Sequence, residues 1–193
     1  QSGNDASVAL AEHVSGSESA FADLMNQYAK ELGMGSTSYR NATGLPDPEH
    51  YTTATDILKL ANAIIREFPD YYRWYSEKEF TWNGITQSNR NGLLWRDSTV
   101  DGMKTGFTDT AGYCLVSSAL RDDMRLVAVV LGTDSPAARE RESQTLLNYG
   151  YRFYETKLLL PGGKALSEAR VWKGETELVD VGVRRNVWVT VPR

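Results

Sequence analysis

The stretch that decides the fold is Val100-Asp101-Gly102-Met103-Lys104-Thr105-Gly106-Phe107-Thr108. We predict that it forms a strand at the edge of a sheet. Lys104, Thr105 and Gly106 would then form an anion-binding rail, because the ammonium supplies charge, the hydroxyl donates a hydrogen bond and the glycine lets a ligand lie against the backbone. Three residues recur by chance in many chains, so this tripeptide is a weak signal alone.

A second short motif, Ser2-Gly3-Asn4, lies roughly a hundred residues upstream of Lys104. It precedes a helical pattern over residues 5–14, and Asn4 or Asp5 is placed to cap that helix. A helix cap is therefore the simple explanation of the motif. The alternative is that Ser2 and Asn4 belong to one site with the Lys-Thr-Gly rail.

Composition limits the classes of partner. The chain has 193 residues, enough for one core or for a core with a small appendage. Its net charge of −4, without a basic cluster, argues against nucleic acid as a partner. No apolar run approaches a membrane span, and no signal peptide opens the chain.

Few side chains suggest a metal or a cofactor. The single cysteine, Cys114, lies in an apolar run, so we predict a buried structural thiol rather than a nucleophile. His13 and His50 have no second ligand in view, and no metal or phosphate-loop pattern occurs, so we predict no cofactor. Asp101 and Asp109 flank the rail and are either general acids or ordinary turn and strand-end carboxylates.

Periodicity and turn signals predict a mixed α/β (α+β) fold with an antiparallel sheet. The expected helices are residues 5–14, 18–32, 53–68 and 136–154. The expected strands are a hairpin of residues 79–82 and 85–87, then residues 100–108, 111–120 and 124–132, of which the last two are paired central strands. Tyr28 and Phe68 are expected on the buried faces of their helices. The aromatic cluster over residues 71–75 is either a substrate platform or packing beneath a loop.

From about residue 157 the sequence pattern changes to short β-like runs separated by glycine turns. These runs are residues 157–160, 169–173, 178–181 and 187–191. We therefore predict two domains, residues 1–155 as part of a catalytic domain and residues 156–193 as the start of a β-rich domain. Four short strands are too few to close a sandwich or a barrel, and a motif stands at the first residues, so we expect that both ends are cut.

Several longer stretches accompany the two motifs. They are Ser2–Ala6, Phe21–Asn26, Gly44–Asp47, Asn89–Trp95, Val100–Met103 and Lys104–Gly106. Through them the whole chain resembles the low-molecular-mass penicillin-binding proteins that act as serine-type D-alanyl-D-alanine carboxypeptidases. The resemblance implies a penicillin-recognition (serine β-lactamase-like) domain followed by a small all-β domain.

The resemblance also implies a reaction. The terminal D-Ala-D-Ala bond of a peptidoglycan stem peptide would be cleaved through an acyl-enzyme, and β-lactam antibiotics would bind the same site. Ser2 would relay a proton toward the leaving amine, and Asn4 would hydrogen-bond the substrate amide or orient a lysine of the Ser-x-x-Lys motif. That motif carries the family's nucleophile, and it does not occur in residues 1–193.

The same resemblance assigns the substrate-binding residues. Lys104 and Thr105, with Gly106, would hold the substrate's C-terminal carboxylate, and Arg139 would assist. The backbone N–H of Phe107 would be one donor of the oxyanion hole, while its large side chain would narrow the cleft.

Family members are exported and end in an amphipathic anchor. The resemblance thus implies a periplasmic protein on the outer face of the bacterial inner membrane. We expect that the N-terminal segment with Ser-x-x-Lys, the signal peptide and the anchor are absent from this chain, so that it contacts a membrane only through the absent anchor.

Three functions stay open. The first is a carboxypeptidase whose N-terminal piece, with the nucleophile, is absent from this chain, which alone would be inactive. The second is a β-lactamase, against which stands the lack of Glu-x-x-Leu-Asn between the two motifs. The third is a non-catalytic fragment or binding module of the same fold.

Overall fold

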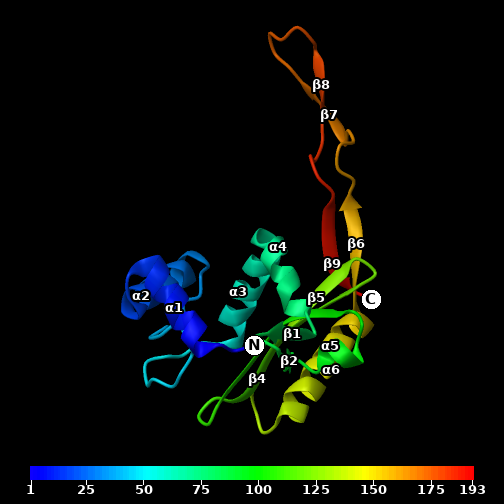
Figure 1. Ribbon diagram of the computed structural model, residues 1–193. Coiled ribbons are helices and arrows are strands. Elements are labelled where there is room, and N and C mark those ends of the chain that lie inside the picture. Colours follow the sequence, from blue (N-terminus) through cyan, green and yellow to red (C-terminus); the bar gives the residue numbers. More distant parts are fainter. The chain divides into compact units, whose positions relative to one another are not determined.

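The computed structural model describes residues 1–193 and divides into two compact units, residues 1–121 with 125–148, and residues 122–124 with 149–193. The elements up to α6 are α1 (Asn4–Ser15), α2 (Glu18–Glu31), α3 (Ala54–Glu67), α4 (Pro69–Tyr72), the 3-10 helix η1 (Arg73–Ser76), β1 (Glu79–Trp82), β2 (Ile85–Ser88), α5 (Leu93–Arg96), β3 (Val100–Thr108), β4 (Gly112–Arg121), β5 (Met124–Thr133) and α6 (Pro136–Phe153) (Figure 1). The predicted mixture of helices with an antiparallel sheet is confirmed.

The central sheet has three strands in the order β3-β4-β5. The predicted edge position of β3 is confirmed, and β3 runs antiparallel to β4 with Lys104 opposite Val116 and Gly106 opposite Cys114. The prediction that β5 is central was wrong for these residues, because no further strand pairs with it. The Lys-Thr-Gly segment therefore lies on a strand with one open edge.

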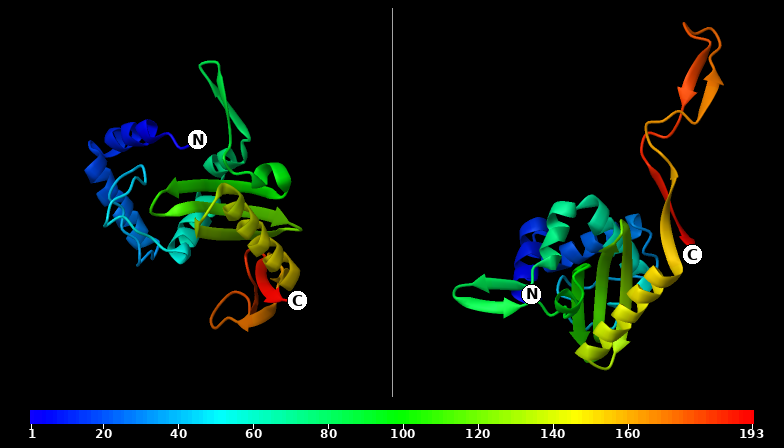
Figure 2. Two further views of the ribbon diagram at one scale, coloured as in Figure 1. Left: turned by 90° about the horizontal axis from the view of Figure 1, so that it is seen from below. Right: turned by 90° about the vertical axis from the view of Figure 1, so that its right-hand side faces the viewer.

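Helices cover both faces of this sheet, with α3 and α4 on one face and α6 along the other (Figures 1 and 2). Ala61 of α3, Tyr72 of α4 and Met103 of β3 form a buried cluster on the first face. Residues 139, 140, 143 and 147 of α6 are buried. Their helical spacing indicates one inward face of that helix.

The predicted cap of α1 was wrong. Gly3 is the N-cap in an extended conformation and its carbonyl accepts a hydrogen bond from the Ser7 N–H, while Asn4 and Asp5 lie in the first turn. The side chains of Asn4 and Asp5 thus start beyond the position from which a cap reaches the free N–H groups. Capping of α1 by the Asn4 or Asp5 side chain therefore does not explain the Ser-x-Asn motif.

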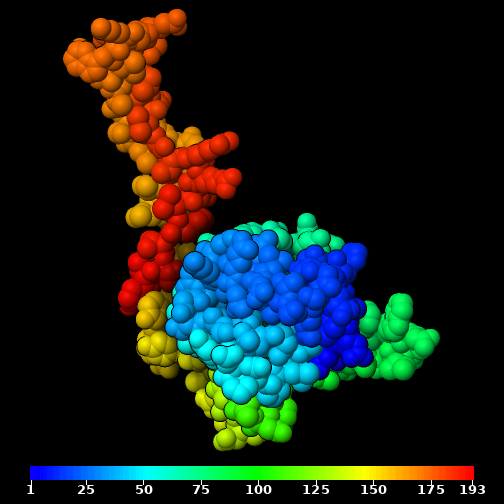
Figure 3. Space-filling model, turned by 90° about the vertical axis from the view of Figure 1, so that its left-hand side faces the viewer, coloured from blue at the N-terminus to red at the C-terminus, as the bar shows by residue number.

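The long loop between α2 and α3, cyan in Figure 3, forms hydrogen bonds to both helices. Asn26 of α2 donates to the Tyr39 carbonyl and accepts from the Tyr39 N–H, each at 2.8 Å. Buried Asp56 of α3 accepts from the Ser36 N–H at 2.8 Å and from the Thr37 hydroxyl at 2.9 Å. These bonds hold residues 36–39 of the loop against the two helices.

Two helical positions differ from the prediction. Phe68 and Tyr28 were expected to be buried but are more than half exposed. For Phe68 the reason is local: α3 ends at Glu67, and Pro69 is the first residue of α4, so Phe68 stands in the bend between the helices. α3 begins at Ala54, one residue after the predicted start, and Thr53 caps it, because the Thr53 hydroxyl accepts from the Asp56 N–H.

The hairpin of β1 and β2 is confirmed, and it projects from the first unit (Figure 3). Its two-residue turn has positive φ at both Asn83 and Gly84, as a type I′ turn requires. Every strand residue of the hairpin is exposed, including Phe80, Trp82 and Ile85.

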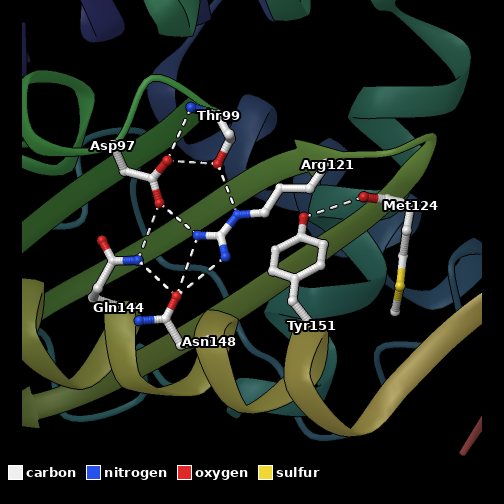
Figure 4. Close-up of polar contacts among 7 residues, drawn as sticks. All are labelled: Asp97, Thr99, Arg121, Met124, Gln144, Asn148 and Tyr151. Carbon is white, nitrogen blue, oxygen red and sulfur yellow. Dashed lines mark hydrogen bonds and ion pairs between the residues drawn. The ribbon is translucent and has the colours of Figure 1, made fainter. Parts of the chain in front are cut away.

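A polar network ties α6 to the end of β4 (Figure 4). Arg121 forms an ion pair with Asp97 at 2.6 Å and donates to the Asn148 side chain at 3.2 Å. Gln144 and Thr99 also donate to the Asp97 carboxylate. Partial burial opposes ionisation, yet these hydrogen bonds, with that from Arg121, lower the pKa of Asp97 to about 2.

The second unit contains two antiparallel strand pairs. One joins β6 (Tyr154–Leu160) to β9 (Val187–Pro192), and the other joins β7 (Ser167–Arg170) to β8 (Leu178–Val181). The Tyr151 hydroxyl donates to the Met124 carbonyl at 3.2 Å within this unit (Figure 4). Across both units, none of the helices combines the length and the apolar character needed to cross a bilayer.

Candidate active site

The two short motifs meet in space. The Lys104 ammonium donates to the Ser2 hydroxyl at 2.6 Å, although the two residues are 102 positions apart in the chain. It also donates to the Thr105 carbonyl at 2.6 Å. Strand β3 presents Lys104 at the open sheet edge, and the segment that leads into α1 places Ser2 beside it.

A groove of about 880 Å³ contains all seven residues that the sequence suggested. They are Ser2, Asn4, Lys104, Thr105, Gly106, Phe107 and Arg139. An ammonium, hydroxyl groups and a guanidinium thus line one open groove, a set that can bind an anion and pass a proton between a lysine and a serine.

The electrostatic setting of Lys104 is unusual for a lysine. The side chain is open to the groove, but the groove wall partly desolvates its ammonium, and the positive charges of Arg90 and Arg139 repel it. These effects, with desolvation the largest, lower the pKa of Lys104. An anionic ligand would relieve the repulsion, so the electrostatics of the groove favour an anion.

Arg139 reaches the same groove from α6. Its side chain is buried, and it donates from Nη1 to the Gly106 carbonyl at 3.2 Å and from Nη2 to the Arg90 carbonyl at 3.5 Å. Burial lowers the pKa of Arg139, which still carries its charge at neutral pH. The helix therefore supplies a second fixed cation beside the Lys-Thr-Gly segment.

An aromatic stack forms one wall of the groove. The rings of Phe107 and Tyr113 stack with their centroids 4.3 Å apart and their planes at 29°. The Arg139 guanidinium lies 5.6 Å from the Tyr113 ring centroid. Phe107 is half exposed, so its side chain narrows the groove at this wall.

A second groove of about 660 Å³ adjoins the first at Ser2 and Lys104. The aromatic cluster divides here: Tyr72 is buried in the core, whereas Tyr71 and Trp74 are exposed and line the groove. Burial, followed by the hydrogen bond to Asp101, raises the pKa of Tyr72. Packing thus accounts for Tyr72, and the substrate platform stays a prediction for the exposed Tyr71 and Trp74.

Sequence reasoning missed part of the groove. Arg90 lines both grooves, and residues 43–45 of the long loop form a further wall. No local pattern signals these positions, because they depend on how distant segments pack. The prediction of a buried Cys114 was wrong, since this thiol is half-buried and lines the groove opposite Gly106 in the strand register.

Asp101 and Asp109, the two carboxylates that flank the Lys-Thr-Gly rail in sequence, lie outside both grooves. Asp101 lines neither groove, and its carboxylate pairs with Arg125 at 2.7 Å and accepts from the Tyr72 hydroxyl at 2.6 Å. Asp109 is exposed and also lies outside both grooves. Nowhere in residues 1–193 do three His, Cys, Asp or Glu side chains gather as metal ligands.

Comparison with protein families gives two matches. A family described as D-alanyl-D-alanine carboxypeptidase matches residues 1–135. A family described as the C-terminal domain of penicillin-binding protein 5 matches residues 154–193. Together they account for nearly the whole chain.

Known relatives agree with these matches. The chain is 47% identical, over its full length, to D-alanyl-D-alanine carboxypeptidase DacA of Escherichia coli strain K12, of which it covers 48%. It is 38% identical over 93% of its length to DacF of Bacillus subtilis strain 168, of which it covers 47%. The chain thus spans about half the length of the curated relatives it matches.

Solved structures confirm the predicted fold class. Penicillin-binding protein 5 of Haemophilus influenzae matches the whole chain with a TM-score of 0.90 and 46% identity, and 56% of that structure is covered. Penicillin-binding protein D2 of Listeria monocytogenes, solved in an ampicillin-bound form, matches 78% of the chain with a TM-score of 0.72 and 32% identity, and 63% of it is covered.

Proposed function

The chain belongs to the D-alanyl-D-alanine carboxypeptidase family, and we propose that the protein is a serine-type carboxypeptidase that removes the terminal D-Ala from peptidoglycan stem pentapeptides. We also propose that β-lactam antibiotics acylate it. The observation that carries the proposal is the hydrogen bond between the Lys104 ammonium and the Ser2 hydroxyl, at 2.6 Å, inside the anion-attracting groove. It joins the two motifs that the family's chemistry requires in one place.

The reaction is an acyl transfer. A serine hydroxyl attacks the carbonyl of the penultimate D-Ala, the peptide bond breaks, terminal D-Ala leaves, and water then hydrolyses the ester. We assign the attacking serine to a Ser-x-x-Lys motif of the full-length protein, outside residues 1–193, since these residues contain no such motif. On this proposal residues 1–193 alone are inactive.

Ser2 and Asn4 serve the proton transfer and the substrate amide. Ser2 relays a proton toward the leaving amine, and its contact with Lys104 gives the hydroxyl a charged partner for that transfer. Asn4 faces the same groove, where its amide group binds the substrate or orients the lysine of Ser-x-x-Lys.

The remaining residues bind the end of the substrate. Lys104, Thr105 and Arg139 hold the terminal carboxylate, and this explains why only the last residue is removed. The backbone N–H of Phe107 is one donor of the oxyanion hole, next to Gly106, which leaves room for the substrate to approach the strand. Loss of one such donor lowers the rate by roughly a hundredfold to a thousandfold.

The protein's location is part of the proposal. We place the full-length protein in the periplasm, on the outer face of the inner membrane, where stem peptides are found. Its support is the family resemblance alone. Detection of the native protein in periplasmic membrane fractions tests this assignment.

The activity is tested with the full-length product of the gene. It is incubated with a pentapeptide ending in D-Ala-D-Ala, and released D-alanine is measured. We expect release by the wild type and a fall in kcat/KM on the order of a hundredfold in Lys104→Ala, because the carboxylate loses a charge-assisted partner. Lys30→Ala, which removes an exposed lysine of α2, is the control and stays near wild type. A wild type that releases no D-alanine contradicts the proposal.

A further inference from the structure

The Lys-Thr-Gly segment is held by a side chain at each end. Asn91 donates from Nδ2 to the carbonyl of Gly102, at 3.0 Å, just before the segment. Arg139 donates to the carbonyl of Gly106, at 3.2 Å, at its other end. Lys104 and Thr105 lie between the two anchor points.

The two anchors are connected to each other. Arg139 also donates to the carbonyl of Arg90, and Arg90 directly precedes Asn91. The contacts therefore run in a closed circuit from Gly102 to Asn91, through Arg90 to Arg139, and back to Gly106. A closed circuit of bonds fixes the separation of the groups it connects more firmly than any one bond.

The turn that carries Asn91 has little freedom. The Asn91 side chain has 0% exposure, and its Oδ1 accepts from the Leu93 N–H at 3.2 Å. The Asn91 N–H in turn donates to the Asn89 side chain at 2.9 Å. At Gly92 a β-carbon would clash with the Glu140 carboxylate, so the turn also lies directly against α6.

We propose that Asn91 is a positioning residue that sets the placement of Lys104 relative to Arg139. Resting on the proposed function, this inference gives Asn91 a part in carboxylate recognition although it lines neither groove. Its amide couples strand β3 to the turn, and the Arg90 carbonyl couples the turn to α6. The two cations are thereby aimed at one carboxylate before the ligand arrives.

The test separates positioning from stability with a matched pair of variants. Asn91→Asp keeps the shape of the side chain and, at a pH where the new carboxyl is ionised, offers no donor to Gly102. Asn26→Asp is the control, because Asn26 forms the same kind of two-way contact with the backbone of Tyr39, away from the groove. Both are made in the full-length product of the gene, and their melting temperatures are compared.

The activity readout is the preference for a carboxylate. Acylation rates are measured with a penicillin and with its methyl ester, and their ratio is the preference. We expect Asn91→Asp to reduce this ratio on the order of tenfold, because a small misplacement of the cations weakens recognition of the acid and not of the ester. Asn26→Asp leaves the ratio unchanged even where it lowers the melting temperature. An unchanged ratio in Asn91→Asp, or an equal fall in both variants, overturns the inference.

A second readout needs no activity. Amide hydrogen exchange over residues 100–108 is compared in Asn91→Ala and Asn26→Ala. We expect faster exchange in this strand for Asn91→Ala alone, because the anchor at Gly102 is lost. If the wild type is not acylated, the proposed function fails, and the hydrogen-exchange comparison alone then tests whether Asn91 positions the strand. Equal exchange in the two variants overturns it.

Discussion

At the scale of single residues, the groove concentrates positive charge around one lysine. Desolvation lowers the pKa of Lys104 most, and the positive charges of Arg90 and Arg139 lower it further. The cost of this repulsion is recovered when a carboxylate binds between the cations. A groove of this kind favours a ligand with a free terminal carboxylate over one whose terminus is blocked.

The charge of Lys104 predicts a pH dependence of kcat/KM, and a substitution at Arg90 should shift it. On the proposed function, substrate binding needs the ammonium form of Lys104, so we expect binding to weaken as pH rises through the lowered pKa of this group. Because Arg90 is one cause of the lowering, after desolvation, Arg90→Ala raises that pKa. We expect the alkaline limb of the kcat/KM profile of the full-length protein to move to higher pH.

The control for this shift is Arg141→Ala, which removes an exposed arginine that pairs with Glu142 on α6. Its alkaline limb coincides with that of the wild type. A limb that moves to lower pH in Arg90→Ala, or not at all, means that Lys104 does not control binding in this pH range. Higher salt reduces the difference between Arg90→Ala and wild type, because it screens the repulsion.

At the scale of elements, the position of α6 matters because this helix carries Arg139 to the groove. The network of Asp97, Arg121, Gln144 and Asn148 fixes the helix to the end of β4 (Figure 4). Closer to the site, Arg139 itself bonds to β3 through the Gly106 carbonyl. The helix is thus held at two places along its length.

The Asp97 carboxylate makes this attachment dependent on pH. Its folded pKa, about 2, is below the ordinary value of 3.8. The stabilisation is therefore complete above the unfolded pKa and is lost as pH falls toward the folded value. After allowance for solvent screening, we expect Asp97→Asn to lower the free energy of unfolding by about 1–2 kcal/mol at neutral pH.

This expectation is measured by urea unfolding of the full-length protein across the acidic range. The difference between Asp97→Asn and wild type shrinks below the unfolded pKa and disappears near the folded one. The control is Asp109→Asn, which changes an exposed aspartate outside the network. A difference that stays constant down to the folded pKa contradicts the role of ionised Asp97.

Most elements could be predicted because their signals are local. Asn83-Gly84 forms the predicted turn, Thr53 caps α3, and Ser135 caps α6 through the Ala138 N–H. Errors occurred where packing decides: Phe68 stands in a bend between two helices, and β5 lacks a partner on its outer side. Neither outcome can be read from periodicity, since both depend on neighbours far away in the chain.

At the scale of the whole molecule, motifs located the site but not its walls. Ser2 and Lys104 were suggested by family resemblance, and the fold brings them together across 102 positions. Arg90 and Asn91 lie in Asn89–Trp95, one of the stretches that support the family resemblance. No local signal in this stretch showed that Arg90 lines the groove or that Asn91 is buried and bonds to Gly102. The domain boundary after residue 155 and the chemical roles of the site residues stay predictions.

The central claim is that these residues belong to an enzyme that is acylated by substrate and by penicillin. The most direct test is the intact mass of the full-length gene product before and after incubation with benzylpenicillin. We predict a gain equal to one penicillin molecule on one serine, and a much slower gain in Lys104→Ala. A mass that stays unchanged, under conditions that label a known penicillin-binding protein, would contradict the account.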